Sequence, residues 1–225
     1  LGANNRNGTT NTDRTNFFED VPVSALERTL FLESDRMGFL GNYISKEMLE
    51  RERGVVQNEK RQGENQPYGR VRNEIGAKMY PYSHPYSWST IGSMDDLQAA
   101  SLEDIREWYR TYYGPNNAVI SLAGDITPEK ALELVTKYFG AIPPGPPLPR
   151  TDTWIPVLDR NLRDEMEDHV PQVRIYRSWH VANWKDADTP RLTLLAEVLA
   201  GSKSARLDKR LVYDKGLATS VNASV

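Results

Sequence analysis

The sequence contains no cysteine, so neither a disulfide bond nor a thiolate–metal site can form within it, and the redox compartment is left open. Long apolar runs are also absent. No stretch approaches the roughly 18 apolar residues that a membrane-spanning helix needs, so no membrane span is expected. The net charge is −3 and the basic residues form no long run, so nothing in the composition favours binding to nucleic acid.

Histidine is scarce as well, with three residues at positions 84, 169 and 180. His84 lies in a loop rich in proline and tyrosine, where an imidazole can bind a metal, relay a proton or satisfy a backbone partner. None of the three histidines has a companion at metal-ligand spacing. The sequence favours a structural role for His84, His169 and His180, and a metal or proton-relay role for His84 is the alternative.

The residues that are present describe an ordinary globular protein of 225 residues, 39% of them hydrophobic and 26% charged. This length allows one large domain or two modest ones. The clearest boundary is the proline-rich run at 143–149, which can neither continue a helix nor join the interior of a sheet. We predict the C-terminal part of a first domain at 1–142, a proline-rich linker at 143–150 and the N-terminal part of a second domain at 151–225.

Hydrophobic periodicity and turn residues predict both helices and strands along the chain. The Asn/Gly cluster near the start of the chain indicates a turn, and a strand is expected to follow it within the first 21 residues. Apolar or alternating runs predict three further strands, at 118–125, 165–181 and 217–225. Helices are predicted at 22–41, 46–65, 72–79, 101–113, 127–139, 187–200 and 201–213.

The predicted helix at 46–65 has an unusual stripe. Ser45 is the expected N-cap, and Met48, Glu52, Val55 or Val56, and Glu59 follow at spacings of three and four, so two carboxylates share the stripe that should face the core. Glu52 and Glu59 are two turns apart, roughly 10 Å along the axis, and are too distant to hold one metal ion between them. One of them can bind a metal while the other orients a neighbour. The alternative is a solvated face, because buried glutamate is rare unless it is paired.

The ten residues at 50–59, Glu-Arg-Glu-Arg-Gly-Val-Val-Gln-Asn-Glu, resemble the downstream glutamate helix of the pitrilysin or insulinase family of zinc peptidases. In that family an inverted His-x-x-Glu-His motif supplies two zinc ligands and the general base. The resemblance implies that Glu59 is the third ligand of a single zinc ion. It also implies that Glu52 supports the catalytic site from beside the metal.

A second match lies at the start of the chain. Asn7, Gly8, Thr9 and Thr10, followed by the run 13–18, are similar to the family's Asn-Ala-x-Thr strand and to the strand that pairs with it. In that family the first strand is an exposed edge on which an extended peptide substrate pairs, so Asn7, Gly8, Thr9 and Thr10 are implied to bind substrate. The resemblance implies an α+β metallohydrolase fold of the LuxS/mitochondrial-processing-peptidase-like type.

The family's function is zinc-dependent hydrolysis of peptide bonds, in which the metal activates water and a glutamate acts as general base. No His-x-x-Glu-His occurs in this sequence. In the family this motif precedes the Gly-Ala-Asn stretch, so we expect this chain to be an internal fragment that is inactive alone, from a parent metalloendopeptidase with one zinc ion. The resemblance implies a peptide or protein substrate, allows a homo- or heterodimer with a related subunit, and favours a periplasmic or secreted location.

Two other functions are open on the sequence. Some family members are catalytically silent subunits or scaffolds that pair with an active partner, and they keep the fold while losing site residues. A stand-alone peptide-binding module that uses only the edge strand is the other alternative. Glu52, Glu59 and the intact Asn-Gly-Thr-Thr run favour the active version.

Overall fold

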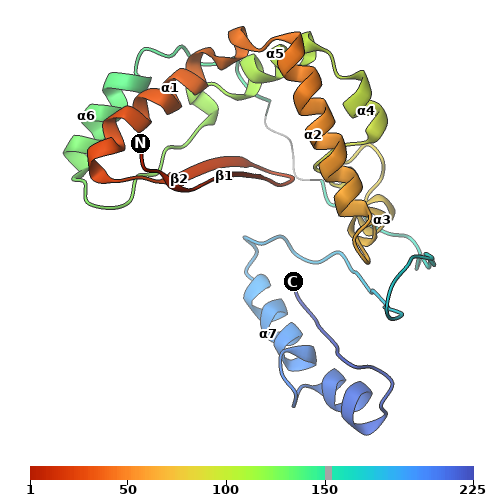
Figure 1. Ribbon diagram of the computed structural model, residues 1–225. Helices are drawn as coiled ribbons and strands as arrows, with labels where there is room; N and C mark the ends of the chain where they lie inside the picture. Colours follow the sequence, from red (N-terminus) through yellow and green to blue (C-terminus); the bar gives the residue numbers. More distant parts are fainter. Residues whose placement is uncertain (150–153) are drawn as a thin grey trace. The chain divides into compact units, whose positions relative to one another are not determined.

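The computed structural model describes residues 1–149 and 154–225 (Figure 1). The chain divides into two compact units, Leu1–Ile175 and Tyr176–Val225, and each is described here by itself. The predicted linker at 143–150 begins within the first unit, where Gly145 donates its N–H to Asn116 Oδ1 at 2.7 Å. Residue 150, its last position, lies outside the described residues, and the predicted domain boundaries stay a prediction.

A two-stranded antiparallel hairpin opens the first unit. Strand β1 (Asn4–Thr10) pairs with β2 (Thr15–Asp20), and the register places Gly8 opposite Phe17. The turn predicted at the Asn/Gly cluster is wrong, because those residues form β1 and the chain reverses at 11–14 instead. Asn5 has a φ of 49°, a left-handed conformation that asparagine tolerates, and it lies in a bulge that shifts the register of β1.

Three helices form the core of the first unit: α1 (Leu26–Tyr43), α5 (Leu102–Tyr112) and α6 (Pro128–Phe139). A short 3₁₀ turn, η1 (Val23–Ala25), leads into α1. Leu30, Leu134 and Phe139 make the buried cluster of α1 and α6. All three helices were predicted from the sequence, and in α5 and α6 the side chains of Ser101 and Thr127 cap the first turn by accepting backbone N–H groups. Helix α1 begins at Leu26 instead of residue 22, and it has no side-chain cap.

The predicted helix stop at Gly41 is wrong. Helix α1 continues to Tyr43, and Gly41 is buried within it against the ring of Tyr109 from α5. A Cβ at position 41 would lie 2.7 Å from Tyr109 Cδ1, so glycine is needed here for close packing. Tyr109 donates its hydroxyl to the carbonyl oxygens of Arg36 and Met37, and burial raises its pKa to about 12.

The remaining elements of the first unit include the helix of the two glutamates. Helix α2 (Lys46–Glu64) packs against α4 (Met94–Ala99), and α3 (Val71–Met79) packs against the 3₁₀ turn η2 (Pro85–Ser87). A further 3₁₀ turn, η3 (Pro115–Asn117), follows α5. The predicted helices at 46–65 and 72–79 are confirmed, and no described helix is long and apolar enough to cross a membrane.

The predicted strand at 118–125 is wrong within the described structure. The run is extended but has no strand beside it; Leu122 packs on the core cluster while Val119 is 95% exposed. The predicted strand at 165–181 is wrong as well, because those residues belong to no ladder among the described strands. A helix satisfies its own backbone hydrogen bonds, whereas a strand forms only where another strand offers partners.

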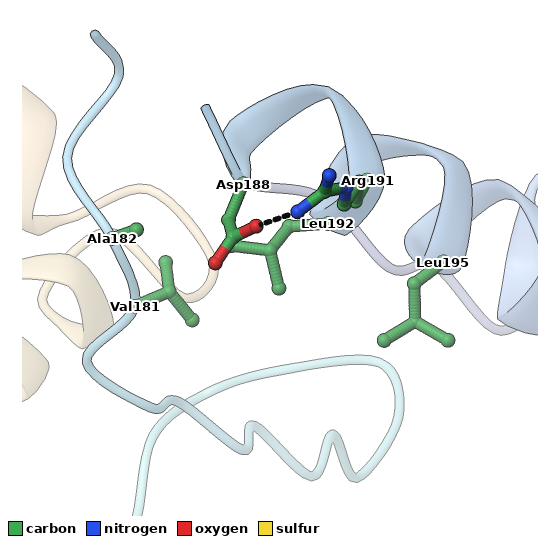
Figure 2. A pocket seen from close by; sticks show the side chains of 6 residues that line it. All are labelled: Val181, Ala182, Asp188, Arg191, Leu192 and Leu195. Carbon is green, nitrogen blue, oxygen red and sulfur yellow. Dashed lines mark hydrogen bonds and ion pairs between the residues drawn. The ribbon is translucent and has the colours of Figure 1, made fainter. Parts of the chain in front are cut away.

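The second unit contains helix α7 (Thr189–Ala200) and the π-helical segment η4 (Asp208–Asp214), which confirm the two helices predicted there. The predicted strand at 217–225 is wrong, since those residues form no ladder among the described residues. A shallow hollow of about 400 Å³ lies beside α7 (Figure 2). Its lining is mainly apolar and includes the Asp188–Arg191 ion pair. The lining residues are Val181, Ala182, Asp188, Arg191, Leu192 and Leu195.

Candidate functional site

The two glutamates lie on the exposed side of α2. The face of α2 toward the rest of the unit includes four half-buried or buried residues at spacings of four, three and four: Leu49, Arg53, Val56 and Lys60. The stripe predicted to face the core is displaced by one residue from this inner face, and four of its members are exposed: Met48, Glu52, Val55 and Glu59. Val56, which the prediction gave as the alternative to Val55, is half-buried and lies on the inner face. The expectation that this stripe faces the core of the described chain is therefore wrong.

The inner face of α2 is displaced from the predicted stripe because two of its positions carry charged side chains. Arg53 and Lys60 are long side chains whose aliphatic stems pack while their charged ends find partners, so they occupy positions that a pattern of apolar residues would not predict. The side chain of Lys60 is 9% exposed and its ammonium lies 2.6 Å from Glu64 Oε1. That of Arg53 is also 9% exposed. Only Leu49 and Val56 mark this face in the sequence.

Glu52 and Glu59 differ in their surroundings. Glu52 Oε1 lies 3.6 Å from Arg51 Nε, a contact between neighbours on the exposed surface. The carboxylate of Glu59 makes neither a hydrogen bond nor an ion pair with any described residue. Its neighbours on the stripe include Val55, which is 54% exposed. Glu59 is thus a carboxylate with free oxygen atoms, on a helix face that also exposes apolar side chains.

These residues fit part of a zinc site only. A catalytic zinc site needs three protein ligands and an open position. Within 1–149 and 154–225, no three His, Cys, Asp or Glu residues are close enough together to hold a metal ion. Glu59 suits the role of one ligand, because its carboxylate is exposed and unpaired. The described residues do not form a zinc site by themselves, so any further ligands would come from outside the described residues.

The N-terminal end of α2 is fixed by its cap. Met48 donates its backbone N–H to Ser45 Oγ at 3.3 Å, as predicted. A hydrogen bond from Ser45 holds the pKa of the Glu47 carboxyl below its usual value, and the backbone N–H of Glu47 adds to this effect. Both interactions favour a negative charge at the positive end of the helix dipole.

The residues predicted to bind substrate lie on an exposed strand with one side unpaired. Every residue of β1 is exposed, and β2 is its only partner in the described sheet. Asn11 donates its N–H to Arg14 O at 2.9 Å, so by alternation Thr9 pairs through hydrogen bonds with β2, while the backbone groups of Gly8 and Thr10 point to the free edge. The Gly8 N–H accordingly donates to Asn7 Oδ1 at 2.8 Å instead of to β2.

The two faces of the hairpin have different chemistry. On one face Phe17 lies under the Arg36 guanidinium, 4.0 Å from ring centroid to Cζ, and a Cβ at Gly8 would lie only 3.1 Å from that ring. On the other face Arg14 donates to Thr9 Oγ1 and to Asn16 Oδ1, each at 2.7 Å. The polar face therefore carries a positive charge beside the predicted substrate residues, which the sequence alone did not indicate.

The geometry at His84 agrees with a structural role. Its Nδ1 accepts the N–H of Tyr86 at 3.1 Å, and its ring contacts those of Tyr80 and Trp154. Tyr86 in turn donates its hydroxyl to Asp13 Oδ1 at 2.6 Å, which raises the pKa of Tyr86 and ties this loop to the hairpin turn. The three histidines are not brought together with any other ligand among the described residues.

Comparison with known proteins identifies the family. The model of the family described as the peptidase M16 inactive domain matches residues 99–225, more than half of the chain, and the chain belongs to this family. The match begins at residue 99, so the hairpin and α2 precede it.

Similar proteins include zinc peptidases. The zinc protease PqqE of Helicobacter pylori is 31% identical over 95% of this chain and 48% of its own length. The probable mitochondrial-processing peptidase subunit beta of Arabidopsis thaliana is 22% identical over 86% of this chain and 36% of its own length. The chain therefore spans about half, or less, of the relatives that it matches.

Solved structures confirm the fold. The crystal structure of a protease from Helicobacter pylori superposes with a TM-score of 0.72 at 26% identity, covering 98% of this chain and 54% of that chain. A peptidase M16 inactive domain from Pseudomonas fluorescens gives a TM-score of 0.72 at 17% identity, covering 98% and 53%. The α+β fold and the resemblance to the zinc peptidase family are thus confirmed.

Proposed function

We propose that this chain is part of a zinc-dependent metalloendopeptidase and contributes one metal ligand and a substrate-binding edge to its active site. The observation that carries the proposal is Glu59, an exposed carboxylate without a described partner, on the same helix face as Glu52. Relatives that are named zinc proteases support it, one of them at 31% identity over 95% of the chain. The 225 residues alone are expected to be inactive, because one carboxylate is a poor zinc site.

The proposal gives the two glutamates different roles. Glu59 provides a carboxylate oxygen to the zinc ion, and the remaining ligands come from residues outside this chain. Glu52 lies two turns earlier and roughly 10 Å away along the helix, so it does not bind the same ion. It orients a neighbouring group of the site, and its contact with Arg51 is weak enough to exchange for such a partner.

Zinc analysis of the whole protein tests these roles. Glu59→Gln replaces an anionic oxygen with a weak neutral donor, so the zinc content is expected to fall to less than about a tenth of wild type. Glu52→Gln should keep most of the zinc and lower kcat/KM by about 10- to 100-fold. Glu107→Gln is the matched control, since Glu107 is also exposed and without a described partner, but lies on α5.

Equal zinc in all four proteins would show that Glu59 is not a ligand, and α2 would then present an ordinary solvated face. Loss of zinc in Glu107→Gln would attribute the effect to charge in general. The control therefore separates coordination by Glu59 from a nonspecific loss of negative charge.

The second part of the proposal assigns peptide binding to the free edge of β1, at Asn7, Gly8, Thr9 and Thr10. An extended peptide pairs with such an edge through backbone hydrogen bonds. The geometry supports Gly8 and Thr10 as the residues whose backbone groups meet the peptide, while Asn7 Oδ1 covers the Gly8 N–H until a substrate displaces it.

Proline substitution distinguishes the two sides of β1. Thr10→Pro removes an outward donor, so KM for extended peptides should rise about 3- to 10-fold, the scale of one hydrogen bond, with zinc content unchanged. Thr9→Pro removes a bond of the hairpin and should lower its protection against hydrogen exchange. An unchanged KM in Thr10→Pro, with the hairpin intact, would exclude this edge as the binding strand.

A catalytically silent subunit is the second candidate, because the matching family model is described as an inactive domain. In that case the whole protein would bind no zinc and would need a partner for activity. The same zinc analysis, applied to the wild-type protein, separates the two functions.

A further inference from the structure

The side chain of Arg53 connects α2 to the end of another helix. Its Nη1 donates to the carbonyl oxygens of Leu97 and Gln98, the latter at 3.1 Å, and its Nη2 donates to Ala100 O at 2.7 Å. The side chain is 9% exposed, and Glu50 closes the outer side of the guanidinium at 3.2 Å from Nε. One buried cation thus binds three carbonyl groups at the C-terminal end of α4.

This arrangement is favourable for two physical reasons. The last carbonyl groups of a helix have no partner within the helix, and they carry partial negative charge. The guanidinium offers five donors in a planar fork, so it can serve several carbonyls at fixed angles. Lysine has the same charge but cannot reproduce the fork. Arg53 therefore fixes an orientation as well as a contact.

The contact sets the rotation of α2 about its own axis. With 3.6 residues per turn, Glu52 lies about 100° and Glu59 about 120° around the helix from Arg53, both in the same direction. One turn further along the helix, Gln57 Nε2 donates to Gln98 Oε1 at 3.0 Å, at the same end of α4. While Arg53 stays bound to α4, the two carboxylates are held on the exposed flank of α2.

We propose that Arg53 is a positioning residue for the metal site: by capping α4 it fixes the direction in which α2 presents Glu59. This inference rests on the proposed function, since it requires Glu59 to be a zinc ligand. Ligands that are held in place bind metal more tightly than mobile ones, and loss of a supporting partner typically costs about 10- to 100-fold in metal affinity.

Chelator competition on the whole protein measures this effect without using activity. Arg53→Gln should weaken zinc binding about 10- to 100-fold and increase hydrogen exchange in α2. Arg53→Lys retains the charge without the fork and should fall between Arg53→Gln and wild type. Arg61→Gln is the matched control, because Arg61 lies on the same helix and its guanidinium bonds, among the described residues, only to Asn58 of that helix.

Four outcomes decide the inference. Weaker zinc binding in Arg53→Gln but not in Arg61→Gln, at similar thermal stability, supports it. Equal zinc affinity in Arg53→Gln and wild type overturns it, and so does an equal loss in both variants, which would indicate a general effect of charge. If Arg53→Gln does not fold, Arg53→Lys gives the decision: an affinity equal to wild type overturns the inference.

Glu59→Gln, measured in the same series, separates this inference from the proposed function. If Glu59→Gln loses zinc while Arg53→Gln retains it, only the positioning role of Arg53 is wrong. If Glu59→Gln retains zinc at wild-type affinity, the assignment of the ligand fails, and the role of Arg53 fails with it.

Discussion

The helices and the apolar extended segments of this chain bury their side chains to very different degrees. In α6, Leu134 is 3% exposed, whereas Val119 in the extended run before that helix is 95% exposed. Val173 and Ile175, in the later extended run, are 92% and 85% exposed. All four are apolar, so hydrophobicity alone does not explain the difference.

The difference shows what each element needs from its surroundings. A helix completes its backbone hydrogen bonds internally and needs only one neighbour for its apolar stripe. An apolar strand needs a partner strand for its backbone as well as cover for its side chains. Within the described residues, β1 and β2 are the strands that find a partner, and they do so through a short hairpin.

The largest effect is expected from truncating the buried side of α6. Leu134→Ala should lower the free energy of unfolding by about 2–5 kcal/mol, because it leaves a cavity among Leu30 and Phe139. Leu132→Ala on the same helix and Val119→Ala should each change it by less than about 0.5 kcal/mol, since both side chains are largely exposed. Denaturant unfolding of the chain measures the free energy of unfolding of all three variants. A loss of several kcal/mol in Val119→Ala would contradict the difference in burial between α6 and the extended run.

A smaller effect is expected where helices approach each other closely. Gly41→Ala places a Cβ 2.7 Å from Tyr109 Cδ1 and should cost about 1–3 kcal/mol. Gly54→Ala in α2, where a Cβ would meet nothing within 4 Å, should stabilise by about 0.5–1 kcal/mol through helix propensity. Opposite shifts in the thermal midpoint are the expected result. Equal shifts of the same sign would contradict the packing at Gly41.

The smallest effect concerns exposed ion pairs. A hydrogen bond from Lys137 lowers the pKa of Glu27 between α6 and α1, and one from Lys78 lowers the pKa of Asp164 in the extended segment. A lowered carboxylate pKa means that the stabilisation is present above the usual pKa and is lost as pH falls through the lowered one. NMR titration measures both groups directly. Lys137→Met should raise the pKa of Glu27 and leave Asp164 unchanged; a shift in both would mean that the two pairs are coupled.

The helices were predictable from the sequence because their signals are local. Ser101 with Asp104 forms a capping box at the start of α5, and Thr127 with Pro128 begins α6, and both are signals that lie within a few residues of the sequence. The extended runs were recognisable in the sequence because they are apolar or alternating. Whether they pair as strands depends on residues far away in the sequence, and a local pattern does not indicate this. The stop expected at Gly41 failed for a related reason, because that glycine serves packing against Tyr109 and does not end the helix.

The residues of the candidate site were predictable from the sequence, but the direction in which their helix face points was less so. The residues at 50–59 indicated Glu52 and Glu59 by resemblance, and the spacing of seven placed them correctly on one face. The exposure of this face matches the alternative of a solvated face, and the stripe was expected to face the core because Arg53 and Lys60 fill two inner positions with charged side chains. Leu49, Arg53, Val56 and Lys60 have the helical spacing of an inner face. Arg53 and Lys60 are charged, so a search for apolar residues does not assign them to that face.

The most direct test of the account is anomalous diffraction at the zinc absorption edge from crystals of the whole protein. The account predicts a zinc ion with a carboxylate oxygen of Glu59 at about 2.0–2.2 Å and with Glu52 outside the coordination sphere. A zinc ion whose ligands do not include Glu59 would contradict it, as would crystals grown with zinc that show no ion beside α2.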